Sequence, residues 1–220
     1  MHIHNLSEQN SLLNAFLYEL RHVEIQKDHM RFRKNIQRIG EILSYEMSKT
    51  LGFKSSMVKT PLGEKSTVLH EEDIVICSIL RAGLTLHVGV LNYFDKAENA
   101  FISAFRKHDP KDTSQFEIIV EYMACPNLEG KTLVLVDPML ASGQSFHLTF
   151  EALKPYGKPK QVHLLSILAS EEGVAFVNEK FPADSHIWVA DIDPLLNDYA
   201  YIVPGLGDAG DLAYGPKLQH

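Results

Sequence analysis

The sequence predicts an α/β protein in which a central parallel sheet carries helices on both faces. Short apolar runs alternate with helical segments along the chain, and these runs are nearly continuous, as in strands buried on both faces. The chain has 220 residues, of which 45% are hydrophobic and 22% charged, the composition of one globular domain. No internal repeat or long Pro/Gly/Ser-rich linker divides it. We therefore expect a single domain over residues 1–220.

Two N-terminal helices are expected within residues 8–52, ahead of the sheet. The first covers about 8–23. The second covers 29–52, where apolar residues recur at spacings of three or four and Gly52 is placed to end the helix. These apolar residues are Phe32, Ile36, Ile39, Leu43 and Met47.

A small β-hairpin is expected next, because residues 55–60 and 66–69 flank the turn Pro61-Leu62-Gly63-Glu64. Strands are then predicted at 73–80, 100–105, 132–137, 161–168 and 186–190, with helices near 83–93, 145–153 and 171–179. Ligands bind at the carboxyl ends of the strands in such sheets. Functional residues are therefore expected in the loops after Leu80, Phe105 and Asp137.

The loop DPMLASGQS, which we call the phosphate loop (residues 137–145), follows a strand and opens a helix. Backbone N–H groups at a helix start can hold a phosphate, and the small residues there allow close approach. Asp137 would face a sugar hydroxyl or a metal. An ordinary turn with a serine cap fits the spacing equally well. The loop consists of Asp137, Pro138, Met139, Leu140, Ala141, Ser142, Gly143, Gln144 and Ser145.

Three motifs in the same order resemble the uracil phosphoribosyltransferase family. They are VLVDPMLASGQS, ILRAG at 79–83 and YIVPGLGDAGD at 201–211, and the resemblance extends from about residue 31 to 217. It implies the phosphoribosyltransferase-like form of the predicted fold, with a small hairpin hood. It also implies transfer of the 5-phosphoribosyl group of 5-phosphoribosyl 1-diphosphate (PRPP) to N1 of uracil, giving UMP and diphosphate in pyrimidine salvage.

The resemblance further implies Mg²⁺ as cofactor, held mainly by PRPP and water, and a homo-oligomer of two or more chains. GTP is an effector of some relatives. The chain departs from the family pattern at Ser78, Ser142 and Gln144, where proline, threonine and glycine are usual. If position 144 needs a positive φ, the glutamine would weaken phosphate binding. The tail at 212–216 also departs, which puts its contacts in question.

Arg81 and Arg106 follow predicted strands and so fall where a ligand is expected. A guanidinium offers paired donors to phosphate oxygens and stays charged. By the resemblance both bind the diphosphate side of PRPP and neutralise the leaving group. The alternative for each is a surface salt bridge, and the surrounding motif favours the ligand role more firmly for Arg81.

A flexible hairpin over PRPP is expected at 107–126. The segment begins with polar residues, KHDPKDTSQ, and continues with spaced apolar ones. Closure of such a lid would exclude water from the reacting sugar. A disordered excursion fits the composition equally well.

Residues 205–210 match G-x-G-x-x-G formally, but Pro204 precedes them and only ten residues follow. Neither the strand nor the helix of a dinucleotide site is expected. An open glycine-rich loop can instead present backbone groups to the edge of a small base. By the resemblance, backbone at Ile202, Gly207, Asp208 and Ala209 holds uracil, and Asp208 also approaches PRPP and orients the base or accepts its proton. A loop that merely packs on the domain is the alternative.

The chain carries 21 basic and 28 acidic residues, a net charge of −7, which disfavours nucleic-acid and anionic-membrane partners. That charge argues against one rival, a non-catalytic RNA-binding regulator that senses UMP. A phosphoribosyltransferase for another base is the second rival.

A cytoplasmic protein is expected, since we find no signal peptide, no membrane-length apolar run and only two cysteines, Cys77 and Cys125. The 11 histidines are scattered without metal-ligand spacing. His2 and His4 are expected on a mobile N-terminus.

Overall fold

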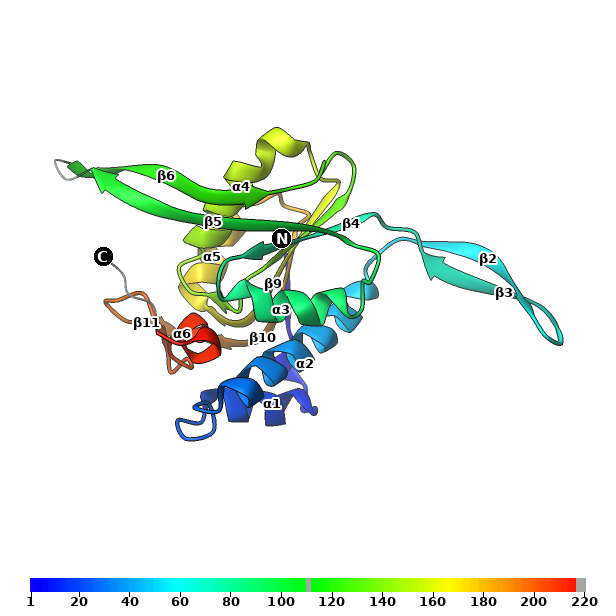
Figure 1. Cartoon of the computed structure of the whole chain (residues 1–220), viewed down its shortest axis with the longest axis horizontal. Helices are drawn as coiled ribbons and strands as arrows, with labels where there is room; N and C mark the ends of the chain where they lie inside the picture. Colours follow the sequence, from blue (N-terminus) through cyan, green and yellow to red (C-terminus); the bar gives the residue numbers. More distant parts are fainter. Residues whose placement is uncertain (110–111, 217–220) are drawn as a thin grey trace.

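The computed structural model describes residues 1–109 and 112–216, with the backbone alone over 104–119. Its centre is a sheet in the order β1-β10-β9-β7-β4-β5-β6, with β8 beside β9 (Figure 1). Every pair is parallel except β5–β6, which is antiparallel. The strands are β1 (His2–Asn5), β4 (Ile74–Ile79), β5 (Glu98–Asp109), β6 (Asp112–Ala124), β7 (Thr132–Val136), β8 (Met139–Leu140), β9 (Gln161–Ser170) and β10 (His186–Asp193).

Helices cover both faces of the sheet, as the sequence predicts. The core on one side joins α1 (Leu13–Arg21), α2 (His29–Ser48), α3 (Gly83–Leu91) and α6 (Ala209–Tyr214) to the sheet. The core on the other side joins α4 (Gln144–Leu153) and α5 (Glu171–Lys180) to it. Alternate residues of one strand enter opposite cores: in β4, Ile76 belongs to the first and Cys77 to the second. Two buried faces explain why these strands are continuous apolar runs.

The N-terminus is part of the sheet, so the expectation of a mobile segment there is wrong. β1 pairs in parallel with β10 at the sheet edge, with His2 opposite His186. The His4 ring stacks on Trp188 at 3.7 Å between centroids, and its Nε2 lies 3.0 Å from Nδ1 of His186. These ring contacts hold β1 against β10. A 3-10 turn, η1 (Leu6–Glu8), follows, and α1 begins only at Leu13.

Two hairpins extend beyond the body of the protein (Figure 1). One is formed by β2 (Phe53–Thr60) and β3 (Gly63–His70), joined in register at Thr60 and Gly63, close to the predicted hairpin. The other is formed by β5 and β6. The backbone on both sides of residues 110–111 pairs antiparallel there. The predicted hairpin at 107–126 falls partly outside the described residues, and its flexibility stays a prediction.

No helix in the described ranges is both long and apolar enough to cross a membrane.

Candidate active site

A cavity of about 190 Å³ lies where the carboxyl ends of β4 and β7 meet the C-terminal segment. It brings together the phosphate loop and the base loop (residues 201–209), which are far apart in the sequence. A crevice at the carboxyl ends of parallel strands is where ligands bind in folds of this kind. The cavity is lined by Ala82, Asp137, Met139, Ala141, Ala200, Tyr201, Ile202, Gly207, Asp208, Ala209 and Gly210.

The phosphate loop presents alternate residues to this cavity. Asp137, Met139 and Ala141 line it. Pro138 and Leu140 are buried behind the lining because residues 139–140 form the short strand β8 against β9. Ser142, Gln144 and Ser145 stand at the start of α4, beside the cavity lining.

Backbone contacts hold the phosphate loop in place. Ser166 and Ser170 donate hydroxyl hydrogen bonds of 2.6 Å to the carbonyls of Asp137 and Ala141. Behind the loop, α5 packs so closely that a Cβ on Gly173 would lie 2.1 Å from the Ala141 carbonyl oxygen. The loop is therefore supported along its length by β9 and α5.

The position that needs glycine is 143. Gly143 caps α4 with φ +75°, and a Cβ there would lie 2.8 Å from Cγ1 of Val177. Gln144 is the first residue of α4, and the only positive-φ residue other than glycine in the described backbone is Ala200. A glutamine at 144 therefore strains no backbone, which answers the question that the sequence raised.

Asp137 is the titratable group whose environment is most unusual in the cavity. Burial, together with the nearby charge of Asp208, raises its pKa to about 7, against the opposing effect of a 3.1 Å hydrogen bond from the Met139 N–H. A carboxyl whose pKa lies near 7 exists in both protonation states at neutral pH, as functional carboxyls often do.

Arg81 lies in the loop between β4 and α3, beside the cavity. Its Nη2 donates to Oδ1 of Asp211 and to the carbonyl of Gly215, both at 2.9 Å. The loop itself packs on β7, since a Cβ on Gly83 would lie 2.6 Å from the Val136 carbonyl oxygen. Arg81 thus joins the phosphate-loop side of the site to the C-terminal tail.

The tail at 211–216 is held mainly through its backbone, which explains how it keeps contacts despite its departures from the family pattern. Nδ1 of His29 lies 2.5 Å from the Leu212 carbonyl, and Nη1 of Arg33 donates to that of Ala213 at 2.7 Å. Hydrogen bonds to backbone carbonyls can form whichever side chain occupies these tail positions. Side-chain bonds add to them, including the one from Arg81 to Asp211 and a 2.5 Å bond between the hydroxyls of Tyr214 and Thr85.

Arg106 lies within β5 and not in a loop after it, so the predicted strand end at Phe105 is wrong. Its backbone pairs with Ile118, because β6 extends the ladder outward. Only the backbone of Arg106 is described, so a contact between its side chain and PRPP stays a prediction.

The base loop is shaped by three backbone features. The Val203–Pro204 peptide bond is cis, Gly205 has φ +57° and Gly207 has φ +95°. Strand β12 (Ile202–Val203) pairs only with the two-residue β11 (Leu195–Leu196), antiparallel. The βαβ unit of a dinucleotide site is therefore not formed at the G-x-G-x-x-G match.

The expectation that no helix follows this loop is wrong. Asp208 caps α6 by accepting a 2.9 Å hydrogen bond from the Asp211 N–H, which starts a helix of six residues. Of the remaining base-loop positions named from the sequence, Ile202 and Ala209 are buried and Gly207 is exposed.

Sequence reasoning missed four residues of the lining: Ala82, Ala200, Tyr201 and Gly210. Ala82, Tyr201 and Gly210 lie inside the quoted motifs, next to residues that were predicted. That position in the motifs could have identified them as lining residues. Ala200 carries no such signal, since only its φ of +60° distinguishes it.

Cys77 and Cys125 are both free, and Cys77 is buried. Burial raises the pKa of both thiols, which makes them poor nucleophiles at neutral pH. Neither lines the cavity.

A model of the family described as "Uracil phosphoribosyltransferase" matches residues 7–216. The uracil phosphoribosyltransferase of Porphyromonas gingivalis is 49% identical over 218 residues, 99% of this chain and 100% of that protein. That of Pyrococcus furiosus is 36% identical over 96% of this chain and 90% of that protein. The solved structure of the AQ2163 protein from Aquifex aeolicus is 30% identical and superposes with a TM-score of 0.84, covering 99% of this chain and 100% of that one.

Proposed function

The chain belongs to the uracil phosphoribosyltransferase family, and we propose that the cavity between the phosphate loop, Arg81 and the base loop is its active site. The protein transfers the 5-phosphoribosyl group of PRPP to N1 of uracil, giving UMP and diphosphate in pyrimidine salvage. The observation that supports this location is that phosphate-loop and base-loop residues line one cavity.

The phosphate loop would hold the 5-phosphate of PRPP. The N–H groups near the start of α4 provide donors for an anion, and the helix dipole adds to their attraction. The hydroxyls of Ser142 and Ser145 can add hydrogen bonds. Asp137, at the near end of the loop, would accept hydrogen bonds from the ribose hydroxyls in its ionised form.

Arg81 would neutralise the diphosphate as it leaves. The two described bonds to the tail use Nη2, and the guanidinium carries further N–H donors on Nε and Nη1 that would bind phosphate oxygens. Arg106 would do the same from the β5–β6 hairpin. Preorganised positive charge at the leaving group lowers the barrier because it stabilises charge that develops in the transition state.

Mg²⁺ is the proposed cofactor. No cluster of three or more His, Cys, Asp or Glu that could hold a metal by itself occurs among the described residues. Asp137 and Asp208, however, both line the cavity and their charges interact. Mg²⁺ is commonly held by one or two carboxylates together with substrate phosphates and water, so this pair fits an ion that PRPP carries. When bound, the ion would offset the charge of the diphosphate.

Backbone groups of the base loop would read uracil. The O2, N3–H and O4 of uracil alternate acceptor, donor and acceptor, and cytosine reverses the last two. A backbone that cannot rearrange leaves buried polar groups unpaired against the wrong base, which discriminates strongly. Asp208, which lines the cavity, would orient the base or accept its proton.

Catalysis would then rest on positioning. The sugar C1 becomes cation-like as the diphosphate leaves, and N1 of uracil attacks from the opposite face. Holding the base and PRPP in line replaces a bimolecular encounter with an effectively unimolecular step. The β5–β6 hairpin would close over PRPP and exclude water during this step.

Release of diphosphate in mixtures of the protein, Mg²⁺, PRPP and one of uracil, cytosine, adenine or guanine tests the reaction. Uracil alone should support turnover, because only its edge matches the proposed pattern. Equal or faster turnover with another base would contradict the base-loop assignment.

Further proposals concern domain organisation, assembly, location and regulation. We propose that residues 1–220 form one domain, that the protein is a homo-oligomer and that it lies in the cytoplasm. The two free cysteines support the location. GTP is proposed as an effector. Sedimentation of the purified chain, and rates measured with and without GTP, test the assembly and the effector separately.

A further inference from the structure

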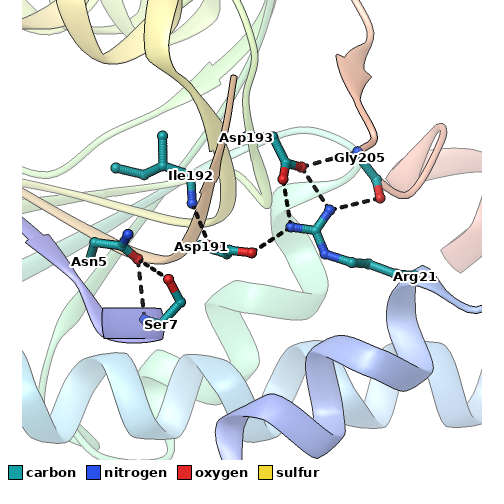
Figure 2. A network of polar contacts seen from close by, with 7 residues as sticks. All are labelled: Asn5, Ser7, Arg21, Asp191, Ile192, Asp193 and Gly205. Carbon is teal, nitrogen blue, oxygen red and sulfur yellow. Dashed lines mark hydrogen bonds and ion pairs between the residues drawn. The ribbon is translucent and has the colours of Figure 1, made fainter. Parts of the chain in front are cut away.

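A partly buried group of charges ties the base loop to the body of the protein (Figure 2). We call it the Arg21 clamp, formed by Arg21 at the end of α1, Asp191 and Asp193 of β10, and Gly205 of the base loop. Nη1 and Nη2 of Arg21 donate to Oδ2 and Oδ1 of Asp193 at 2.7 and 2.9 Å. Nη2 also donates to Oδ2 of Asp191 at 2.7 Å.

The clamp holds both polar backbone groups of Gly205. Nη1 of Arg21 donates to the Gly205 carbonyl at 3.0 Å, and the Gly205 N–H donates to Oδ2 of Asp193 at 3.0 Å. Gly205 also has no room for a side chain, since a Cβ would lie 2.1 Å from the Ile202 carbonyl oxygen. The loop backbone is therefore fixed at this point in position and in direction.

Burial makes this attachment specific to arginine. The side chain of Asp193 is 7% exposed and that of Arg21 is 22% exposed. A carboxylate with so little contact with water is costly to leave without a hydrogen-bonded partner. The planar guanidinium reaches both oxygens of Asp193 and the Gly205 carbonyl together, which a lysine ammonium cannot do with the same geometry.

We propose that Arg21 is a positioning residue for uracil recognition. This inference rests on the proposed function, in which backbone groups between Ile202 and Ala209 read the base. Gly205 lies at the middle of that stretch, between Ile202 and Gly207, which line the cavity. A backbone reader discriminates only if its groups are held within a fraction of an ångström, so the clamp sets how well uracil is told from cytosine.

Two variants of the full-length protein test this role, Arg21→Lys and Arg21→Met. Lysine keeps a charge beside Asp193 but loses the fork, whereas methionine loses both. We expect kcat/KM for uracil to fall about 10- to 100-fold in Arg21→Met, mostly through KM, since small misplacements far from the chemistry cost this much. KM for PRPP should change less than about two-fold. For Arg21→Lys, kcat/KM for uracil should lie between the values of Arg21→Met and the wild type. Cytosine should compete better relative to uracil in both.

A matched control is Arg31→Met. Arg31 of α2 holds α1 through hydrogen bonds to Glu19, and none of the hydrogen bonds described for it reaches the base loop. In this variant, KM for uracil and KM for PRPP should both stay near their wild-type values. Circular dichroism and thermal melting establish that each variant is folded, and if Arg21→Met does not fold, Arg21→Lys carries the test alone.

Gly207→Ala separates failure of this inference from failure of the proposed function. Gly207 has φ +95° and lines the cavity, so an alanine there should raise KM for uracil directly. If it does so while Arg21→Lys leaves KM for uracil and cytosine competition unchanged, the positioning role is wrong and the base-loop assignment stands. If Gly207→Ala also leaves KM for uracil unchanged, the base is bound elsewhere and both proposals are overturned.

Discussion

The phosphate loop and the base loop line one cavity but are held by different means. The phosphate loop runs directly from β7 into α4, and hydroxyls of the neighbouring strand β9 hold its carbonyls. The base loop contains the two-residue strand β12, paired with the equally short β11, and leads into the six-residue α6; its anchor is Arg21, 184 residues away from Gly205 in the sequence. A loop between long regular elements is fixed locally, whereas a loop without them needs side chains from remote elements.

The difference is suited to what each loop would recognise. A phosphate is a symmetric anion, and a helix start with small residues is sufficient to bind it. A pyrimidine edge has an ordered pattern of donors and acceptors. The backbone that recognises it therefore needs both a fixed conformation and a fixed position relative to the rest of the site. Changes in the two loops should therefore affect different kinetic constants.

The largest effect in the phosphate loop is expected from Gly143→Ala. The alanine would have to adopt φ +75° with its Cβ 2.8 Å from Val177 and 2.9 Å from Phe176, so the start of α4 would move. We expect kcat/KM for PRPP to fall about 100-fold and KM for uracil to change little. Stability should fall by about 1–3 kcal/mol in urea unfolding.

Gly130→Ala is its control. Gly130 has φ +71°, nearly the same as Gly143, but nothing lies within 4 Å of an added Cβ. It should lose about 1 kcal/mol of stability from backbone strain with normal kinetics. A similar loss of PRPP use in both variants would mean that the kinetic effect comes from lowered stability and not from the phosphate loop.

A smaller effect is expected from Asp137→Asn, and it depends on pH. The folded state raises the pKa of Asp137 to about 7 from 3.8, so it binds the proton more tightly than the unfolded chain does. The stability of the wild type should therefore fall as the pH rises from about 4 to 7, since the unfolded state binds fewer protons there. The asparagine variant lacks this slope and should be more stable than the wild type by up to about 4 kcal/mol at pH 8, with little difference near pH 4.

The same variant should bind PRPP more weakly at pH 8, where the wild-type carboxylate is ionised, and differ less at pH 6. Thermal melting and KM for PRPP across this range measure both effects. Parallel pH profiles for the two proteins would show that Asp137 does not titrate near neutral pH.

The smallest effect is expected from Gln144→Gly, which restores the residue usual in the family. Position 144 is helical, so glycine gains nothing there and costs about 0.5–1 kcal/mol of helix stability. KM for PRPP should stay within about two-fold of wild type in the same assay. A gain of five-fold or more would show that the bulk of Gln144, and not its backbone, limits phosphate binding.

Much of the fold could be predicted because it depends on local pattern. Strands β4 and β7 are buried along their whole length and so are almost entirely apolar, and α2 shows its buried face through residues spaced three or four apart. The phosphate loop could be located for the same reason, since a strand, small residues and a helix follow one another without interruption.

Other features could not be predicted from pattern. β1 is four residues long and mostly polar, and its place in the sheet rests on backbone pairing with β10 and on the stacking of His4 on Trp188. The six-residue α6 is too short to show a period, and its start depends on Asp208 as a cap.

By itself, the sequence determined the layers of this protein and the place of the strand–loop–helix segment proposed to bind an anion, because burial and turn formation act between neighbours in the chain. The tertiary structure decided how the base loop is anchored. The pairing of Arg21 with Asp193 and Gly205 joins residues more than 170 positions apart, and no spacing records it. Such a pairing exists only after packing has removed the charges from water and left each as the nearest partner of the other.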